Sequence, residues 1–362
     1  MKLRLFILAL LISGSSFFSL DSNAAEKVRL LLPQRTVDEA LAPFIVAKHL
    51  GYYEQEGLNV EMLLVGGSNE TAIQIASGNA EIGLASPAQA VIGMQEGAAA
   101  PLDIRYFYNA AYQNIWSISV PGDSAIQSIA ELRGKRIGVT ALGSAGTTYG
   151  RAYLRSGGLN PDADVSFIAI GAGSQAIAAI KQKVVEAFVF WDSANARFEM
   201  SGLPVRALKI DEKLKRLPDV SLLARNETIR NNPKMLTGFA RATAKGLDFS
   251  LANPAAAVFI TWKLYPESKP NEAGPEKSLA QGLRINQPRM AGWVEPSTNG
   301  KRGLFIQQDW ESLGEFLLQG QQIAKPVPAS RMYTNALIDD VNQYDREAIN
   351  RQARGFDLNS VR

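Results

Sequence analysis

The stretch APFIVAKHLGYYEQEGLNV, residues 42–60, is predicted to contain one helix and the start of the strand that follows it. Residues 43–53 of this stretch have the apolar spacing of an amphipathic helix. The apolar run at 58–65 then predicts a strand, and a second apolar run at 28–33 precedes the helix. Together these segments predict a strand-helix-strand unit, which forms a parallel sheet with a right-handed crossover.

The same alternation continues along the chain. In the first half it adds strands at 80–85 and 103–110 and helices at 69–77 and 89–97. A second series is predicted further on, with strands at 115–120, 135–140, 165–170 and 186–191 and helices at 124–133, 145–156 and 174–183. Beyond residue 233 the pattern is helical, as in 234–251 and 310–318. The sequence therefore predicts two α/β sheets in succession and a helical region that packs on one of them.

The composition excludes many kinds of chemistry. The chain has 362 residues, no cysteine and one histidine, His49. Without cysteine there are no disulfides, thiolate metal sites, iron–sulfur clusters or cysteine nucleophiles. A single histidine leaves no His-rich metal site, and no G-x-S-x-G nucleophile motif occurs. The net charge of +3 gives no strongly basic face for nucleic acid. We expect about two folded domains, with no metal, no cofactor, no nucleic-acid partner and no enzymatic activity.

Residues 1–24 have the three parts of a secretory signal peptide. Lys2 and Arg4 give a basic start, residues 5–12 are apolar, and small residues precede a cleavage point after Ala24. The apolar run is shorter than the ~20 residues that span a bilayer. We therefore expect an exported protein that is free in solution in a bacterial periplasm.

Loops of small residues end several predicted strands. The loop at 171–176 reads GAGSQA and precedes Asp192 by the spacing of a dinucleotide fingerprint. That reading is disfavoured, because the loop lies deep in the second series and does not open a nucleotide-binding half. The loops at 66–69 and 143–148 stand where ligands of open α/β sheets bind. Ser144 is positioned to cap a helix whose first amides form an anion site, although an ordinary capped helix fits this stretch as well.

Four stretches also carry a family pattern. They are residues 42–60, GNAEIG at 78–83, ELRGKRIGV at 131–139 and FWD at 190–192. The segment from 325 to 338 continues the likeness. In this order the chain resembles the nitrate/sulfonate/taurine-type periplasmic substrate-binding proteins of ABC importers, a group that also contains pyrimidine-precursor binders of thiamine metabolism.

The resemblance implies an α/β protein of the type II periplasmic-binding fold, with a ligand cleft between two α/β lobes and a helical C-terminal region. Lobe I is expected to comprise residues 25–112 and 231–362, and lobe II residues 113–230, with crossings near 109–115 and 226–233. The implied mechanism is hinge closure around a small organic anion, such as a sulfonate, taurine or a nitrate-like ion. The expected partners are this small-molecule ligand and a membrane permease, and the protein is expected to be a monomer.

Three alternatives to this function stay open. The same fold could bind an aromatic carboxylate or a pyrimidine precursor, or it could serve a membrane receptor in sensing. It could also be an enzyme, although the enzymes that resemble these binders carry a cysteine-rich iron motif that is absent here.

Loop positions and the resemblance together give the expected ligand-binding residues. Arg35 is expected to pair with the anionic group of the ligand. Trp191 and Tyr112 are expected to wall its apolar part. Asp192 is expected to orient Arg35 or a backbone group, or to bind a ligand amine. The full set is Gln34, Arg35, Ser68, Asn69, Ser86, Tyr112, Gln113, Ser144, Gly146, Thr147, Trp191 and Asp192.

Overall fold

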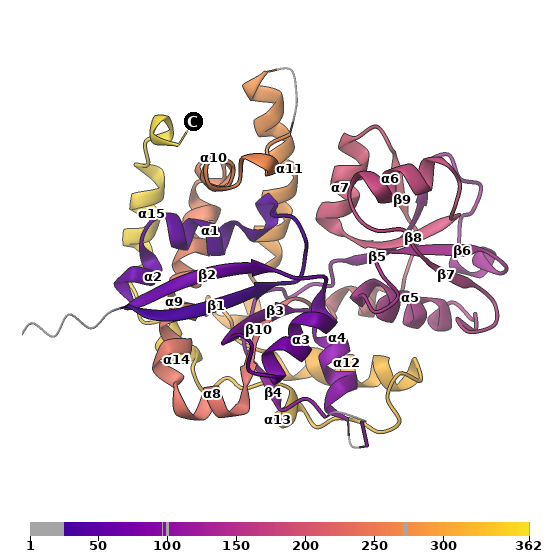
Figure 1. Ribbon diagram of the computed structural model, residues 1–362, viewed down its shortest axis with the longest axis horizontal. Coiled ribbons are helices and arrows are strands. Elements are labelled where there is room, and N and C mark those ends of the chain that lie inside the picture. Colours follow the sequence, from indigo (N-terminus) through magenta and orange to yellow (C-terminus); the bar gives the residue numbers. More distant parts are fainter. Residues whose placement is uncertain (1–24, 96, 99–100, 271–273, 362) are drawn as a thin grey trace, which may run out of the picture.

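Two five-stranded sheets, each flanked by helices, form two lobes that lie side by side (Figure 1). The computed structural model describes residues 25–95, 97–98, 101–270 and 274–361. The predicted signal peptide, residues 1–24, lies outside the described residues. The prediction of two α/β sheets in succession, followed by helices, is confirmed.

The first sheet has the strand order β2-β1-β3-β10-β4. Its strands are β1 (Glu26–Leu32), β2 (Leu58–Leu64), β3 (Ile82–Ala85), β4 (Ile104–Asn109) and β10 (Ser221–Arg225). Between the first four lie helices α1 (Ala42–His49), α2 (Tyr52–Gln55), α3 (Ser68–Ala76) and α4 (Pro87–Met94), with the short 3-10 helix η1 (Glu39–Leu41) before α1. β1 runs parallel to β2 and to β3, as the predicted units require. The helix predicted at 43–53 is two helices, because Gly51 between them has a φ of 72° that ends α1.

Strand β10 returns the chain to the first sheet earlier than predicted. It lies antiparallel between β3 and β4, with Leu222 opposite Leu84 and Tyr108. The chain has therefore re-entered the first sheet at Ser221, so the predicted crossing at 226–233 and the predicted end of lobe II at residue 230 are too late. Strands separated by helix-length segments indicate parallel strand-helix-strand units. This spacing gives no sign of a short antiparallel strand that inserts between two strands of the sheet.

The second sheet has the strand order β7-β6-β8-β5-β9. Its strands are β5 (Trp116–Pro121), β6 (Arg136–Val139), β7 (Ser166–Ala169), β8 (Ala187–Trp191) and β9 (Val205–Ala207). Helices α5 (Ala145–Ser156), α6 (Ser174–Lys181) and α7 (Asp192–Met200) accompany them. β6 runs parallel to β7 and β8, whereas β5 is antiparallel to β8 and β9. The four strands predicted for the second sheet are thus confirmed. The sheet differs from the prediction in that β5 is antiparallel and β9 is an additional strand.

The prediction of a helix at 124–133 is wrong. That segment holds only the 3-10 helix η2 (Ile129–Leu132). The hydroxyl of Ser124 accepts from the amide of Ile126 at 3.3 Å, and the carboxylate of Glu131 accepts from the amide of Gln127 at 3.2 Å. Such local side-chain bonds satisfy backbone groups that a helix would otherwise use.

The C-terminal region is helical, as predicted, and covers the first lobe. Its elements are α8 (Asn226–Asn231), α9 (Pro233–Ala252), α10 (Pro254–Leu264), η4 (Pro266–Ser268), α11 (Pro275–Gly292), η5 (Pro296–Thr298), α12 (Gln307–Gln319), α13 (Ala329–Met332), α14 (Ile338–Val341), α15 (Arg346–Arg354) and η6 (Leu358–Ser360). Phe239 of α9 stacks on Tyr53 with ring centroids 5.0 Å apart, inside a core shared by β1, α1, α9 and α10. None of the described helices combines the length and apolarity needed to cross a membrane.

One apolar cluster continues from the first lobe into the second. It joins Tyr106 of β4 and Trp310 of α12 to Trp116 of β5 and Tyr149 of α5. α11 of the first lobe also faces α7 of the second (Figure 1). The lobes are therefore in contact on both sides of the segments that join them, 110–115 and 208–220.

Candidate functional site

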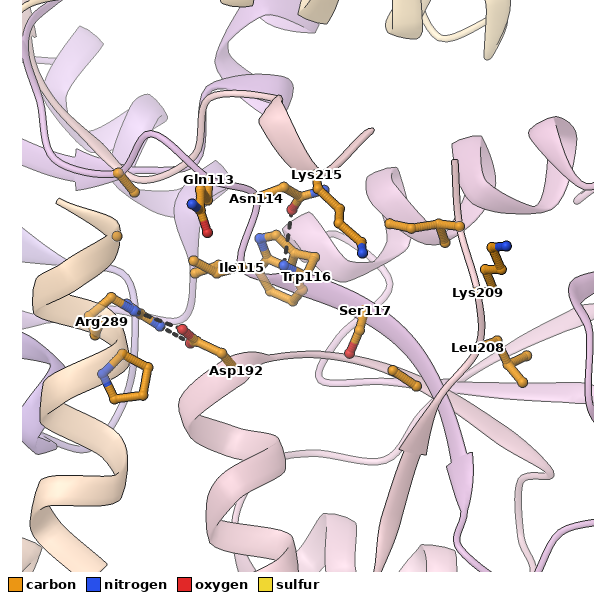
Figure 2. A pocket seen from close by; sticks show the side chains of 15 residues that line it. Gln113, Asn114, Ile115, Trp116, Ser117, Asp192, Leu208, Lys209, Lys215 and Arg289 are labelled. Carbon is orange, nitrogen blue, oxygen red and sulfur yellow. Dashed lines mark hydrogen bonds and ion pairs between the residues drawn. The ribbon is translucent and has the colours of Figure 1, made fainter. Parts of the chain in front are cut away.

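A pocket of about 490 Å³ lies between the lobes, beside the two joining segments (Figure 2). Its walls come from both joining segments, the start of β5, the start of α7 and the C-terminal part of α11. The apolar lining residues are Ala111, Ile115, Trp116, Ala207, Leu208, Ile210 and Pro288. The polar ones are Gln113, Asn114, Ser117, Asp192, Lys209, Lys215 and Arg289. A ligand in this pocket would contact both lobes and the two joining segments at once.

An ion pair between the lobes forms one wall of the pocket. Arg289 reaches from α11 toward Asp192 at the start of α7 (Figure 2). Its Nε donates to Asp192 Oδ2 at 3.1 Å, and its Nη2 donates to Oδ1. Burial acts to lower the pKa of Arg289, but the carboxylate of Asp192, with Asp38 and Asp219 further away, outweighs burial and raises that pKa. Arg289 is therefore a fixed positive charge beside the pocket.

The pocket carries more positive than negative charge. Of the residues that line it, Lys209, Lys215 and Arg289 are basic and only Asp192 is acidic. Lys215 also contacts Glu212 at 2.8 Å, but both side chains are exposed, and such surface pairs hold little energy. A site with this balance attracts an anion.

Trp116 connects the pocket to the strand ends of both lobes. Its indole Nε1 donates to Ser86 Oγ of the first lobe at 3.3 Å. Its ring stacks on Tyr149 of α5 at 6.0 Å and meets the edge of Trp191 at 5.7 Å. The side chain is held from both lobes, so its position depends on how the lobes are arranged.

Asp219 is a fully buried carboxylate next to this cluster. It accepts from the hydroxyl of Ser86, from the amide of Ile115 at 3.2 Å and from the amide of Val220 at 2.7 Å. Burial raises its pKa from 3.8 to about 6, and these hydrogen bonds only partly oppose that rise. Since Ile115 belongs to the first joining segment, Asp219 ties that segment to the first sheet.

Helix α7 is joined to the first lobe by further polar contacts. Arg197 donates to the buried carboxylate of Glu39 at 2.9 Å, and Ser193 Oγ donates to Asp38 Oδ2 at 3.0 Å. Glu39 also accepts from the indole of Trp262 at 2.6 Å, and burial raises its pKa. The bonds of Arg197 and Ser193 join the two lobes, whereas the bond of Trp262 lies within the first lobe.

The opposite side of the lobe interface is also closed by hydrogen bonds. Gln89 of α4 donates to the carbonyl of Ser144 at 2.9 Å and to the hydroxyl of Thr148 at 2.5 Å. Gln322 donates to the carbonyl of Thr148 at 3.1 Å. In the described arrangement the two lobes are therefore joined by hydrogen bonds on both sides of their interface.

Several residues expected from the sequence come together here. Gln113 and Asp192 line the pocket itself. Ser86, Trp191 and Gly146 surround Trp116, and a Cβ added at Gly146 would lie 3.0 Å from its ring. Ser68 supports this group, because its Oγ accepts from the amide of Ser86 at 3.0 Å.

Other expected residues lie away from the pocket. Arg35 is exposed and lies beside Gly66, and Asn69 faces Gly143 on the outer edge of the lobe interface. Gln34 donates to the carbonyl of Thr36 at 2.7 Å, and Thr147 donates to that of Ala141 at 3.2 Å. The structure pairs Asp192 with Arg289, not with Arg35.

Two further expected residues are buried with unpaired polar atoms. Ser144 occupies the position before α5, but its hydroxyl does not cap the helix and has no hydrogen-bond partner. Tyr112 is buried at the end of the first sheet, and its hydroxyl is also unpaired. Neither lines the pocket described above.

Sequence reasoning missed Trp116, Asp219 and Arg289. A tryptophan that opens a strand directly after the first crossing was a usable signal for Trp116. Arg289 had none, because it lies 97 residues from Asp192 in a helix that the sequence pattern assigned only to packing. Among the described residues, no group of three or more His, Asp or Glu side chains is arranged to hold a metal ion.

Comparisons with known proteins agree with this architecture. A family model described as NMT1/THI5 like matches residues 39–257. The riboflavin-binding protein RibY of Chloroflexus aurantiacus is 24% identical over 302 residues, which cover 82% of this chain and 82% of RibY.

Two solved structures share the fold. The alkanesulfonate-binding protein SsuA of Xanthomonas axonopodis pv. citri, bound to MOPS, superposes with a TM-score of 0.65 at 16% identity and covers 86% of this chain and 99% of its own. The periplasmic nitrate-binding protein NrtA of Synechocystis PCC 6803 superposes with a TM-score of 0.60 at 16% identity, covering 93% of this chain and 91% of its own. The predicted periplasmic-binding fold is thereby confirmed.

Proposed function

The chain belongs to the NMT1/THI5-like family, and on this basis we propose that it is the solute-binding component of an ABC importer. The fold shared with SsuA and NrtA supports a binding role in the periplasm. In this proposal residues 1–24 direct export and are removed, and the mature protein delivers its solute to a membrane permease as a monomer.

The solute we propose is a small organic anion bound in the pocket between the lobes. The observation that carries this proposal is the lining of the pocket, which contains three basic side chains and one acidic side chain. The volume of about 490 Å³ is within the ~300–1,000 Å³ of sites that enclose organic ligands. Apolar residues, Trp116 and Leu208 among them, form the rest of the wall, which favours a sulfonate or carboxylate with an organic body over a bare inorganic ion.

Capture follows from the position of the pocket. A ligand that touches α11 on one lobe and β5 and α7 on the other binds the closed form better than the open one. It therefore shifts the equilibrium toward closure, and the permease receives the closed, loaded protein. No bond in the solute is broken in this mechanism.

A second candidate is a flat aromatic solute with little charge. The RibY relative, which spans 82% of the chain, is named for riboflavin binding. The indole of Trp116 in the pocket wall offers a surface for such a ring.

Thermal denaturation with a panel of solutes separates these candidates. The panel contains alkanesulfonates, taurine, nitrate, aromatic carboxylates, pyrimidines and riboflavin, and all anionic members are added as salts of the same cation. A solute at 100 times its Kd adds about 2.7 kcal/mol to the free energy of unfolding. Stabilisation by organic anions alone supports the proposal, and stabilisation by riboflavin or a neutral pyrimidine alone supports the second candidate. No stabilisation by any member contradicts both.

Matched charge variants then locate the site. Lys209→Gln removes a positive charge from the pocket wall, and we expect it to weaken the best anion severalfold. Lys277→Gln removes the same charge from an exposed position of α11 outside the pocket and should leave the Kd unchanged. If Arg35→Ala weakens the anion and Lys209→Gln does not, the anion binds at the loop predicted from the sequence and the proposed pocket is wrong.

A further inference from the structure

The most buried positive charge of the pocket is already paired with a carboxylate of the protein. The side chain of Arg289 is 6% exposed, whereas that of its partner Asp192 is 40% exposed. Arg289 donates through Nε and Nη2 only, although a guanidinium has five N–H groups. Its Nη1 has no partner among the described residues and is not fully buried. At the pocket wall, Arg289 therefore has two nitrogens whose N–H groups are bound to Asp192, Nε and Nη2, and one nitrogen without a partner among the described residues, Nη1.

We infer that Asp192 is an internal substitute for the acidic group of the ligand. In the ligand-free protein its carboxylate occupies the donors of Arg289, and the carboxylate or sulfonate of an incoming ligand displaces it. This inference rests on the proposed function, because it assumes that an organic anion binds in this pocket.

While the lobes are together, the buried charge of Arg289 is paired both before and after the exchange. A buried charge that loses its partner is strongly destabilising. An anionic ligand replaces the carboxylate of Asp192 by another group of the same charge and similar acceptor geometry, so the penalty does not arise. A neutral solute cannot replace Asp192 in this way, and the pair thus selects for anions.

Asp192 has a second position in which its carboxylate is stabilised. It is the first residue of α7, and its Oδ1 already accepts from the amide of Ser193 at 2.7 Å. A negative charge is favourable at a helix N-terminus. After displacement, the half-exposed carboxylate can keep this bond and turn toward solvent, while Arg289 holds the ligand from the other lobe.

Chemical rescue of Asp192→Ala tests the inference without knowledge of the natural solute. The probes are acetate and methanesulfonate, each compared with chloride at equal ionic strength, and the readout is Tm. We expect Asp192→Ala to gain Tm with both probes by more than the wild type, because the donors of Arg289 are then free. Asp192→Ala with Arg289→Gln should lose that gain.

Glu199→Ala is the matched control. It also removes an acid of α7 that pairs with an arginine of α11, Arg284, but this pair is exposed and outside the pocket. We expect its response to the probes to equal that of the wild type. If Asp192→Ala responds no more than Glu199→Ala, the inference is wrong. If Asp192→Ala does not fold, Asp192→Asn replaces it in the same comparison.

The affinity for ethanesulfonate and taurine gives a second measurement. Because the ligand no longer competes with Asp192, Asp192→Asn should bind ethanesulfonate about tenfold more tightly than the wild type. If instead Asp192 binds a ligand amine, Asp192→Asn will weaken taurine and leave ethanesulfonate unchanged, which overturns the inference. If acetate and methanesulfonate raise the Tm of Asp192→Ala but no solute of the panel stabilises the wild type, the result contradicts the proposed function and supports the role of Asp192. If solutes of the panel stabilise the wild type but the small anions do not rescue Asp192→Ala, the proposed function is supported and the role of Asp192 is contradicted.

Discussion

Arg197 of α7 donates a hydrogen bond of 2.9 Å to Glu39, a carboxylate that is fully buried in the opposite lobe. When the lobes separate, Glu39 loses this partner and keeps the indole N–H of Trp262. A buried carboxylate without its cation is costly. In the proposed mechanism this pair therefore favours closure even in the absence of a solute.

Arg197→Ala should shift the ligand-free protein toward the open form. The reason is that closure then no longer restores a cation to the buried carboxylate of Glu39. Small-angle X-ray scattering is expected to give a larger radius of gyration than for the wild type, and a saturating solute should reduce the difference. Arg284→Ala is the control, because its pair with Glu199 joins the same two helices but is exposed and holds little energy. Identical scattering from Arg197→Ala and Arg284→Ala would contradict this role.

Asp219 should make stability depend on pH. Burial raises its pKa from 3.8 in the unfolded chain to about 6 in the folded protein. The stabilisation of the folded protein by this carboxyl group is therefore fully present below about pH 4 and is lost as the pH rises through about 6. With about 1.4 kcal/mol per pKa unit, the free energy of unfolding of the wild type should fall by roughly 3 kcal/mol relative to Asp219→Asn between pH 4 and pH 7.5.

Urea denaturation of both proteins at a series of pH values measures this difference directly. Glu39 and the other titrating groups are common to the two proteins and cancel. Parallel pH profiles would mean that Asp219 has the same pKa in the folded and unfolded states.

Much of the fold was predictable because its signals are local. The helix expected at 145–156 coincides with α5, since its helical pattern follows directly from a strand and a small-residue loop. β10 was not predictable in the same way. Its five residues become a strand only because β3 and β4 leave a place between them, and that place exists only after the rest of the sheet has formed.

The same distinction between local and long-range signals applies to the residues of the site. Residues at the ends of strands, such as Ser86 directly after β3 and Trp191 at the end of β8, were placed from the sequence because the end of a strand fixes where these residues lie. Arg289 was not, because its position depends on how α11 docks against α7. The assignment of the anion to Arg35 rested on loop position alone, and the exposed loop turns that side chain toward Gly66.

Gly146→Ala should destabilise the start of α5. The added Cβ would lie 2.8 Å from the carbonyl oxygen of Val189 and 3.0 Å from the ring of Trp116. Because the nearest atom belongs to the backbone, α5 has to move, at about 1–3 kcal/mol. Gly143→Ala is the matched control: its Cβ meets nothing nearer than Asn69 at 4.0 Å, so its effect should stay within about 0.5 kcal/mol. Equal unfolding free energies in urea for the two variants would contradict the close approach.

Trp116 and Ser86 should be energetically coupled, because their hydrogen bond joins the two lobes. Trp116→Phe keeps the aromatic packing on Tyr149 and removes the indole donor, so we expect a loss of about 1 kcal/mol. Trp116→Ala also leaves a cavity, and its cost should reach about 3–5 kcal/mol.

Ser86→Ala should cost more than Trp116→Phe, since it also takes the hydroxyl donor away from the buried carboxylate of Asp219. In the double variant the indole bond is lost only once, so the sum of the single effects should exceed the combined effect by at least about 0.5 kcal/mol. Urea denaturation of the four proteins measures this cycle. Additive effects would mean that the two side chains do not interact in solution.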